Sequence, residues 1–359
     1  MDRREFLAAS AAVVPVMAGA RSMAATNEHA PAAQRDARDF PPPAFPVAIS
    51  SANGLRSVAR AVKLISEGMD PLDAAVEGIT IVEDDPADNS VGYGGLPNEA
   101  GVVELDACAM HGPSHKAGAV AGIQNIKNPG KVALLVLKRT NHVLLVGEGA
   151  KQFALQHGFK EEDLLTPESR RAWLRWRENL SASDDRLNRE QHVDRDMIPL
   201  RSHDDIPFTE GTIHCSAVDT RGDLGGVTST SGLSYKIPGR VGDSPIIGAG
   251  NFTDNLVGSA GGTGRGEAAI KSCAAFQVVN HMASGVEPTE ACLRVLKWVA
   301  NHTRRRMLLN EKGEPNFQLT LYALRKDGAY GSASMRSGKD FAIADAAGAR
   351  LEKCAYVYE

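Results

Sequence analysis

The sequence predicts a layered α/β protein in which one β-sheet packs on another. Its predicted elements run as strands, then helices, then strands, and not in the regular strand–helix alternation of a parallel doubly wound fold. The 359 residues are 43% hydrophobic and 23% charged, which is typical of a globular protein with a substantial core. This length allows one large domain or two ordinary ones, and we see no internal repeat.

Charge and aromatic content argue against a nucleic-acid-binding protein. The net charge is -4, whereas nucleic-acid binders usually show a basic face, and 5% aromatic residues are too few for base-stacking platforms. The five cysteines show no paired metal-binding spacing, and their odd number leaves at least one unpaired in a monomer. We expect most of them to be small buried hydrophobic residues.

The first 25 residues resemble a twin-arginine export signal. Arg3 and Arg4 precede an alanine-rich apolar run that is too short for a membrane span. Residues 26–45 are polar and proline-rich and predict a linker. We therefore expect export to the periplasm or the medium; a lipid or membrane anchor and an ordinary helix are the alternatives.

The ordered domain is expected to begin at Pro46. Asp70 followed by Pro71 is a typical helix start, with an N-cap residue and then a proline in the first turn. The expected elements of this half are a strand at 47–50, helices over 55–65 and 71–82, a strand over 101–110 and further strand-like alternation over 132–146.

A charged, weakly periodic stretch then divides the chain. Its first part, from Glu168, favours a helix, whereas residues 181–211 are typical of a mobile surface segment. An apolar strand begins abruptly after it. The expected later elements are strands at 213–218 and 226–230, helices at 267–282 and 288–301, and strands at 317–324, 329–334 and 341–344.

Thr212 stands at this abrupt change, directly after Gly211. A threonine at a free N-terminus is a nucleophile with its own base, because its α-amine has a pKa of about 7.7 to 8.0. In the intact chain this nitrogen is an amide and accepts no proton. Cleavage between these two residues would therefore activate the enzyme, although Gly-Thr pairs are also ordinary strand starts.

Hydroxyl groups gather at the end of the next predicted strand, over residues 228–231. If the two strands pair as neighbours, this end comes close to Thr212, where a hydroxyl can hydrogen-bond the nucleophile. The alternative is that these residues are ordinary strand threonines and serines facing solvent.

Arg240 and Asp243 lie three residues apart in a loop flanked by glycines. An arginine fork matches a carboxylate and an aspartate matches an ammonium group, so the pair suits the two charged ends of an α-amino acid. A surface salt bridge is the alternative.

A glycine-rich run over 261–266 precedes a predicted helix. It lacks the Gly-Lys-Ser/Thr ending of a phosphate-binding P-loop. We expect it to form an oxyanion hole, with backbone N–H groups and the Thr263 hydroxyl near the helix N-terminus.

Two histidine patterns point to no site. His111 and His115 are four residues apart, but Gly-Pro between them argues against a helix and no third metal ligand is apparent. His214 and Cys215 are neighbours on a strand, where successive side chains point to opposite faces, so a Cys-His catalytic pair is not expected.

From about Val47 to Glu359, the chain resembles the glycosylasparaginase family of N-terminal-nucleophile hydrolases, relatives of the isoaspartyl peptidase/L-asparaginases. The order and spacing of several stretches carry this resemblance. These are VEDDP (82–86), VGYGG (91–95), LDACAM (105–110), NP followed by KVA (128–133), HVLLVGEGA (142–150) and YKIPGRVGDSPIIGAG (235–250).

The resemblance implies an α+β fold, a four-layer αββα sandwich, cut into an α-chain of residues 46–211 and a β-chain of residues 212–359. It implies hydrolysis of N4-(β-N-acetylglucosaminyl)-L-asparagine through an aspartyl-threonine ester, without metal or organic cofactor, by a homodimer of αβ units. The resemblance implies that Thr212 is the nucleophile and that Thr230 hydrogen-bonds it. Arg240 and Asp243 would bind the substrate carboxylate and the substrate ammonium group. Thr263 and Gly264 would form the oxyanion hole, and Gly264 would also contact the substrate amine.

Three positions depart from the glycosylasparaginase pattern. Ala52 stands where those enzymes carry a tryptophan beside the nucleophile, and His214 replaces a glycine. Gly211 stands where they commonly have aspartate, and Gly-Thr is the pattern of the isoaspartyl peptidase branch. An isoaspartyl dipeptidase or L-asparaginase is therefore the alternative enzyme, and a non-catalytic amino-acid-binding protein is the alternative outside enzymes.

Overall fold

The computed structural model describes residues 40–178, 180 and 211–359. The predicted export signal (1–25), most of the predicted linker (26–45) and nearly all of the predicted pre-cleavage segment (181–211) lie outside these ranges. Residues 40–46 contain no strand or helix, and the strand predicted at 47–50 is found over Val47–Ser51.

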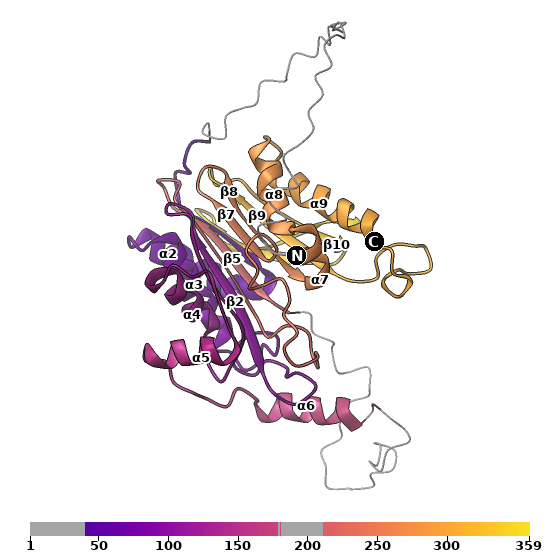
Figure 1. Ribbon diagram of the computed structural model, residues 1–359. Helices are drawn as coiled ribbons and strands as arrows, with labels where there is room; N and C mark the ends of the chain where they lie inside the picture. Colours follow the sequence, from indigo (N-terminus) through magenta and orange to yellow (C-terminus); the bar gives the residue numbers. More distant parts are fainter. Residues whose placement is uncertain (1–39, 179, 181–210) are drawn as a thin grey trace, which may run out of the picture. The chain divides into compact units, whose positions relative to one another are not determined.

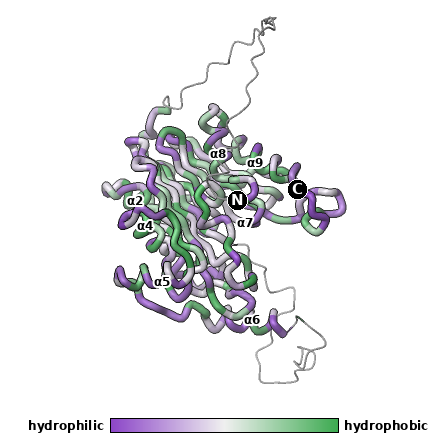
Figure 2. Tube along the Cα trace, viewed as in Figure 1, coloured by the Kyte–Doolittle hydropathy of each residue, from purple (hydrophilic) through white to green (hydrophobic). Residues whose placement is uncertain are grey.

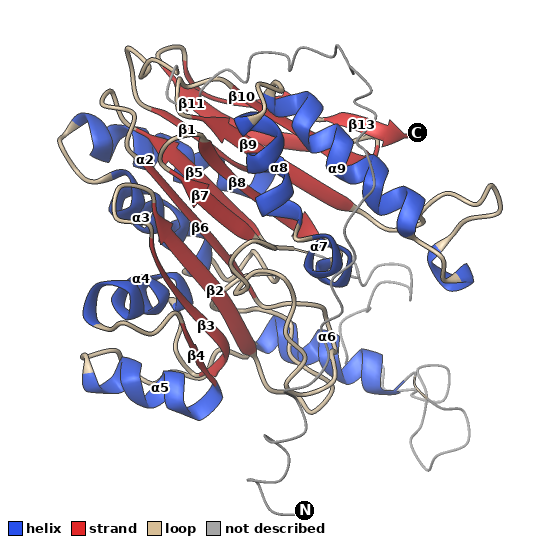
Figure 3. Ribbon diagram, turned by 45° about the horizontal axis from the view of Figure 1, so that its top comes forward, coloured by secondary structure: helices blue, strands red, loops and turns tan. Residues whose placement is uncertain are grey.

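Two β-sheets form the middle of the domain (Figures 1 and 3). The eight-stranded sheet has the order β12 (Gly348–Lys353), β11 (Asp340–Asp345), β1 (Val47–Ser51), β5 (Ile213–Val218), β6 (Leu224–Thr230), β2 (Glu104–His111), β3 (Lys116–Gln124) and β4 (Leu144–Val146). The five-stranded sheet has the order β13 (Ala355–Tyr358), β10 (Tyr330–Arg336), β9 (Leu319–Arg325), β8 (Gly258–Gly264) and β7 (Asn251–Asp254).

Helices cover the outer face of each sheet (Figure 3). The eight-stranded sheet carries α2 (Leu55–Ser66), α3 (Pro71–Glu83), α4 (Pro129–Arg139) and α5 (Gly147–Gln156), and the five-stranded sheet carries α7 (Gly266–Ser272), α8 (Ala274–Ala283) and α9 (Pro288–His302). The short 3-10 turns are η2 (Ala52–Gly54) and η4 (Arg306–Leu308). The arrangement is an αββα sandwich, which confirms the predicted fold class.

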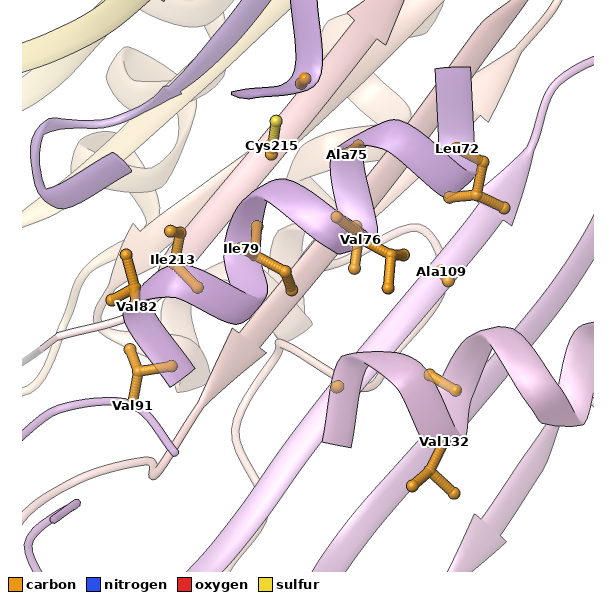
Figure 4. Close-up of a cluster of buried hydrophobic side chains, with 14 of the residues drawn as sticks. Leu72, Ala75, Val76, Ile79, Val82, Val91, Ala109, Val132, Ile213 and Cys215 are labelled. Atoms are coloured by element: carbon orange, nitrogen blue, oxygen red, sulfur yellow. The ribbon is translucent and has the colours of Figure 1, made fainter. Parts of the chain in front are cut away.

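Three hydrophobic clusters fill the interfaces between these four layers. The first lies under α2 to α5, and Figure 4 shows the α3 side chains of Val76 and Ile79 in this cluster together with Ile213 of β5. The second lies under α7 to α9. The third lies between the sheets and includes Ile49 and Leu224. In Figure 2 hydrophobic residues gather along the central strands. Burial of this apolar surface is the main force that holds the layers together.

The predicted helix start at Asp70 is confirmed. The Asp70 carboxylate accepts hydrogen bonds from the backbone N–H of Leu72 (2.9 Å) and Asp73 (3.4 Å), and Pro71 occupies the first turn of α3. The predicted helix after Glu168 is also confirmed as α6 (Pro167–Glu178).

Some predicted elements are wrong or incomplete. Residues 132–146 hold α4 and the short β4, not a strand throughout, because Pro129 starts a helix that buries Val132 and Val136 on one face. The predicted helix over 267–282 is broken at Cys273, whose φ of 47° is left-handed. Most of the glycine-rich run over 261–266 belongs to strand β8, which was not among the expected strands.

Four of the five cysteines are buried, as expected, and none is disulfide-bonded; Cys273 is exposed. None of the helices in the described ranges is both long and apolar enough to cross a membrane.

Candidate active site

Thr212 lies at the entrance to β5, in the middle of the eight-stranded sheet, and is 8% exposed. The register of β5 and β6 pairs Ile213 with Ser229, so Thr230 lies beside Thr212. This confirms the expectation that strand pairing brings the 228–231 hydroxyls to the start of β5.

The Thr212 hydroxyl lies between two oxygens. Its Oγ1 is 2.8 Å from the carbonyl oxygen of Gly211 and 3.1 Å from Oγ1 of Thr230, which is itself 2.8 Å from the same carbonyl. The backbone N–H of Gly232 donates to Thr230 Oγ1 at 2.9 Å and fixes that hydroxyl. The Thr212 hydroxyl is therefore held within hydrogen-bonding distance of the oxygen of the preceding carbonyl, the group that a self-cleavage reaction would attack at its carbon.

Two cavities meet at Thr212. A cleft of about 910 Å³ opens on one side, lined by Ala52 and by residues from several strands, including Thr263 and Tyr322. A space of about 10 Å³, the size of one water molecule, lies on the other side and is lined by Arg240 and Asp243 among others. Gly211, Thr212 and Gly264 line both.

Arg240 and Asp243 both reach the small cavity, but they do not pair with each other. Arg240 donates from Nε (3.0 Å) and Nη2 (2.8 Å) to the same oxygen of Glu267, at the start of α7. The structure thus brings the two predicted residues to one cavity, and Glu267 is an additional partner that sequence reasoning missed.

Asp243 carries a buried carboxyl group with one oxygen that could bind a cation. Burial raises its pKa from the ordinary 3.8 to about 7, while the nearby Arg240 charge opposes this rise. Within the described residues, no hydrogen-bond partner reaches Asp243 Oδ2. A substrate ammonium group would satisfy this oxygen and stabilise the ionised form.

A buried ion cluster supports the loop that carries Arg240. The Lys236 ammonium group donates to the carbonyl oxygen of Glu104 (3.1 Å) and lies 4.0 Å from carboxylate oxygens of Glu104 and Asp106. Glu104 also accepts from the backbone N–H of Gly239 at 3.2 Å. These charges fix the path of residues 236–240. Asp106 and Lys236 lie in stretches that carry the family resemblance, but nothing in their spacing predicted this contact.

Thr263 and Gly264 are placed by a strand and not by a glycine-rich loop. They end β8 and lie across the cleft from Thr212, and Gly264 has a φ of 111°, a conformation that favours glycine. The Thr263 hydroxyl is 2.9 Å from the hydroxyl of Tyr322 on β9. The expected helix N-terminus is close, since α7 begins at Gly266.

A family model described as asparaginase matches residues 48–321. The chain belongs to this asparaginase family. A relative named N(4)-(Beta-N-acetylglucosaminyl)-L-asparaginase from Elizabethkingia miricola is 41% identical over 308 residues, covering 86% of this chain and 84% of that protein. The resemblance identified in the sequence is confirmed.

Two further relatives carry the names of the two alternative activities. A rat protein named N(4)-(Beta-N-acetylglucosaminyl)-L-asparaginase is 35% identical and covers 76% of this chain and 79% of its own length. An Arabidopsis thaliana protein named probable isoaspartyl peptidase/L-asparaginase 3 is 32% identical and covers 80% of this chain and 84% of its own length.

His111 and His214, for which no site was expected, have structural hydrogen-bond partners. His111 bonds to Asp70 (3.1 Å) and Ser114 (2.7 Å), and no group of three potential metal ligands occurs among the described residues. His214 points between the sheets, whereas Cys215 packs in the cluster under the helices, so the two face opposite ways as predicted.

Proposed function

We propose that this protein is a self-processing amidohydrolase that cleaves the side-chain amide of N4-(β-N-acetylglucosaminyl)-L-asparagine and releases aspartate. The position of Thr212 supports this proposal most directly. Its hydroxyl touches the carbonyl of Gly211 and stands where a small charged cavity meets a large open cleft. A substrate whose amino-acid part binds in the small cavity and whose leaving group lies in the cleft would have its amide bond at this hydroxyl.

The first step is self-cleavage. The Thr212 oxygen attacks the carbonyl carbon of Gly211, the C–N bond between the residues breaks, and the acyl group moves to the oxygen as an ester. Water then hydrolyses this ester, which leaves a carboxylate on Gly211 and a free amine on Thr212. Thr230 assists by hydrogen-bonding both the attacking hydroxyl and the attacked carbonyl.

The second step is substrate hydrolysis. The new amine, with a pKa of about 7.7 to 8.0, takes the hydroxyl proton as the oxygen attacks the substrate amide carbon. The hydroxyl of Thr263 and the backbone N–H of Gly264 stabilise the negative oxygen that forms. The amine proton passes to the leaving amino group, and water later releases aspartate from the ester. This chemistry uses no metal or organic cofactor.

Substrate binding rearranges the small cavity, which holds no more than one water molecule in the uncut chain. The substrate carboxylate replaces Glu267 as the partner of the Arg240 fork, and the substrate ammonium group binds Asp243, with Gly264 also contacting this amine. Cleavage frees Gly211, which lines this cavity, to move aside.

The cleft of about 910 Å³ suits a large polar leaving group such as an amino sugar. Ala52 leaves this cleft open at the position where glycosylasparaginases carry tryptophan. The same openness, together with the Gly-Thr junction and the Arabidopsis relative, favours isoaspartyl dipeptidase or L-asparaginase activity as the second candidate. We also propose twin-arginine export to the periplasm or medium and a homodimer of αβ units, on the basis of residues 1–25 and of family likeness.

The decisive experiment is a Thr212→Ala variant assayed beside the wild type. Wild-type protein is expected to yield two fragments by mass spectrometry, the second beginning with Thr212, and to hydrolyse the glycosyl-asparagine faster than a β-aspartyl dipeptide or asparagine. Thr212→Ala should stay uncut and inactive. Thr80→Ala, which removes a helix hydroxyl bonded to Val76, is the matched control and should cut and turn over normally.

Turnover by an uncut wild-type chain would refute the mechanism. Faster hydrolysis of the β-aspartyl dipeptide would make the second candidate correct. An uncut, inactive wild-type chain that still binds aspartate would instead support the non-catalytic binding protein.

A further inference from the structure

The hydroxyl of Thr263 can stabilise an oxyanion only if its proton points into the cleft. A threonine hydroxyl carries one proton and two lone pairs. If this proton is donated to another protein atom, the hydroxyl turns a lone pair toward the substrate and repels the developing charge. The hydrogen-bond neighbour of Thr263 therefore decides whether the Thr263 hydroxyl stabilises or destabilises the oxyanion.

Tyr322 is this neighbour. The register of β8 and β9 pairs Gly261 with Tyr322 and Thr263 with Thr320, so Tyr322 and Thr320 are two residues apart and share a face of the sheet. The Tyr322 hydroxyl lies 2.9 Å from Thr263 Oγ1, and both side chains line the cleft that contains Thr212.

A phenol is a stronger proton donor than an alkyl hydroxyl, because it is far more acidic. Burial also raises the pKa of Tyr322 above the ordinary 10, so the phenol keeps its proton at every working pH. The geometry allows either hydroxyl to donate, and the Thr320 hydroxyl is a second hydrogen-bonding neighbour of the phenol; the greater acidity of the phenol favours Tyr322 as the donor to Thr263.

We propose that Tyr322 is a positioning residue for the reaction, which donates its proton to Thr263 Oγ1 and so directs the Thr263 proton toward the reacting carbonyl oxygen. This inference rests on the proposed function, in which Thr263 belongs to the oxyanion hole.

His214 holds the Tyr322 ring in place. The two rings stack with centroids 5.9 Å apart and planes 8° from parallel. The imidazole is fixed at both nitrogens, by the hydroxyls of Thr228 and Ser216, each at 2.8 Å. Burial lowers the pKa of His214 to about 3, so the ring is neutral and adds no charge to the site.

Gly261 makes this stack sterically possible. A Cβ atom at position 261 would lie 2.1 Å from His214 Nδ1, so any side chain there would displace the imidazole. His214, which stands where the family pattern has a glycine, thus occupies the space that Gly261 leaves on the opposite sheet. Its ring supports the phenol ring of Tyr322.

The test is a double-mutant cycle with Tyr322→Phe and Thr263→Val. Tyr322→Phe is expected to lower kcat about 10-fold with KM unchanged, the effect of one lost hydrogen bond. Thr263→Val should lower kcat about 100-fold. The double variant should match Thr263→Val alone, because Tyr322 acts through Thr263. Tyr330→Phe, on the neighbouring β10, is the matched control and should keep wild-type kcat.

An unchanged kcat in Tyr322→Phe would overturn the inference. So would an equal further loss in the Thr263→Val background, since this would show that the phenol acts by another route. Thermal melting and the extent of self-cleavage identify any variant that fails through misfolding.

Neutron diffraction of the deuterated Thr212→Ala protein gives a readout that needs no turnover. The deuteron between the two oxygens is expected on Tyr322, with the Thr263 deuteron directed into the cleft. A Thr263 deuteron pointing at Tyr322 would reverse the assignment. If the wild type hydrolyses none of the substrates, the proposed function fails, while the neutron result still decides how this hydroxyl pair is ordered.

Discussion

A methyl group on Gly211 would lie 1.9 Å from both Cβ and Oγ of Ser90. Ser90 has little freedom to move, because its carbonyl accepts hydrogen bonds from N (2.8 Å) and Oγ (2.9 Å) of Ser231, and its own hydroxyl bonds to Asp88. Glycine is therefore the residue that fits before Thr212 without a shift of this loop.

Gly211→Ala is thus expected to slow self-cleavage at least about 10-fold, since even a small displacement of the carbonyl from the Thr212 hydroxyl is costly. The fraction of cut protein over time, measured by gel electrophoresis, checks this. Adding Ser90→Gly should restore most of the rate. Gly149→Ala in α5, where a Cβ would meet open space, is the control. Wild-type cleavage of Gly211→Ala would show that Ser90 imposes no constraint.

Arg240→Lys should raise KM about 10- to 100-fold with little change in kcat. The two nitrogens that now bind one Glu267 oxygen form a planar fork that lysine lacks, and this fork is expected to bind the substrate carboxylate. Steady-state kinetics give both constants. Arg294→Lys, which alters an exposed arginine–glutamate pair on α9, should change neither. An unaltered KM in Arg240→Lys would mean that the substrate carboxylate binds elsewhere.

The affinity for substrate should depend on pH through Asp243. Its pKa of about 7 means that the carboxyl group is largely protonated below pH 7 and cannot hold an ammonium group. KM should therefore rise as the pH falls from 8 to 6. A substrate analogue without the α-amino group should show no such change in KM, while its kcat still follows the Thr212 amine. Parallel KM profiles for the two compounds would exclude Asp243 as the ammonium ligand.

Glu83→Gln should stabilise the protein at neutral and alkaline pH. Glu83 is fully buried, and burial raises its pKa from 4.5 to about 7 although Ser229 and Gly130 donate hydrogen bonds to it. The folded state keeps the proton between these two pH values and the unfolded state loses it, so stability falls as the pH rises through this window, by at most roughly 1.4 kcal/mol per pH unit.

The advantage of Glu83→Gln in thermal melting should thus be near zero at pH 4.5 and largest above pH 7. Glu77→Gln, on the same helix but partly exposed, provides the comparison. An advantage that is constant with pH would mean that Glu83 does not titrate in this window.

The sequence predicted those parts of the site that lie close together in the chain or are joined by adjacent strands. Thr212 and Thr230 are 18 residues apart, yet an apolar strand on each side of a short turn was enough to pair them. The fold class followed from the order of elements and from family likeness.

The sequence could not predict the contacts that depend on the packing of one sheet on the other. β8 is mostly glycine, which strands generally disfavour, so local propensity gave no strand prediction for these residues. Its strand form depends on pairing with β7 and β9, and Gly261 within it leaves the space that His214 of the other sheet occupies. Arg240 and Thr263 meet partners that lie 27 and 59 residues away, and nothing in local spacing signals these pairs.

If the chain is cut before Thr212 as proposed, the strand order of the larger sheet has a further consequence. The fragment before the cut supplies β1 and β2, and the fragment after it supplies β11, β5 and β6, so the fragments alternate at the β11–β1, β1–β5 and β6–β2 borders. Neither fragment can dissociate without breaking the backbone hydrogen bonds that join it to the other fragment. Dissociation and unfolding become a single event, and a protein that first folded as one chain would have to reassemble from two, at a rate that depends on its concentration.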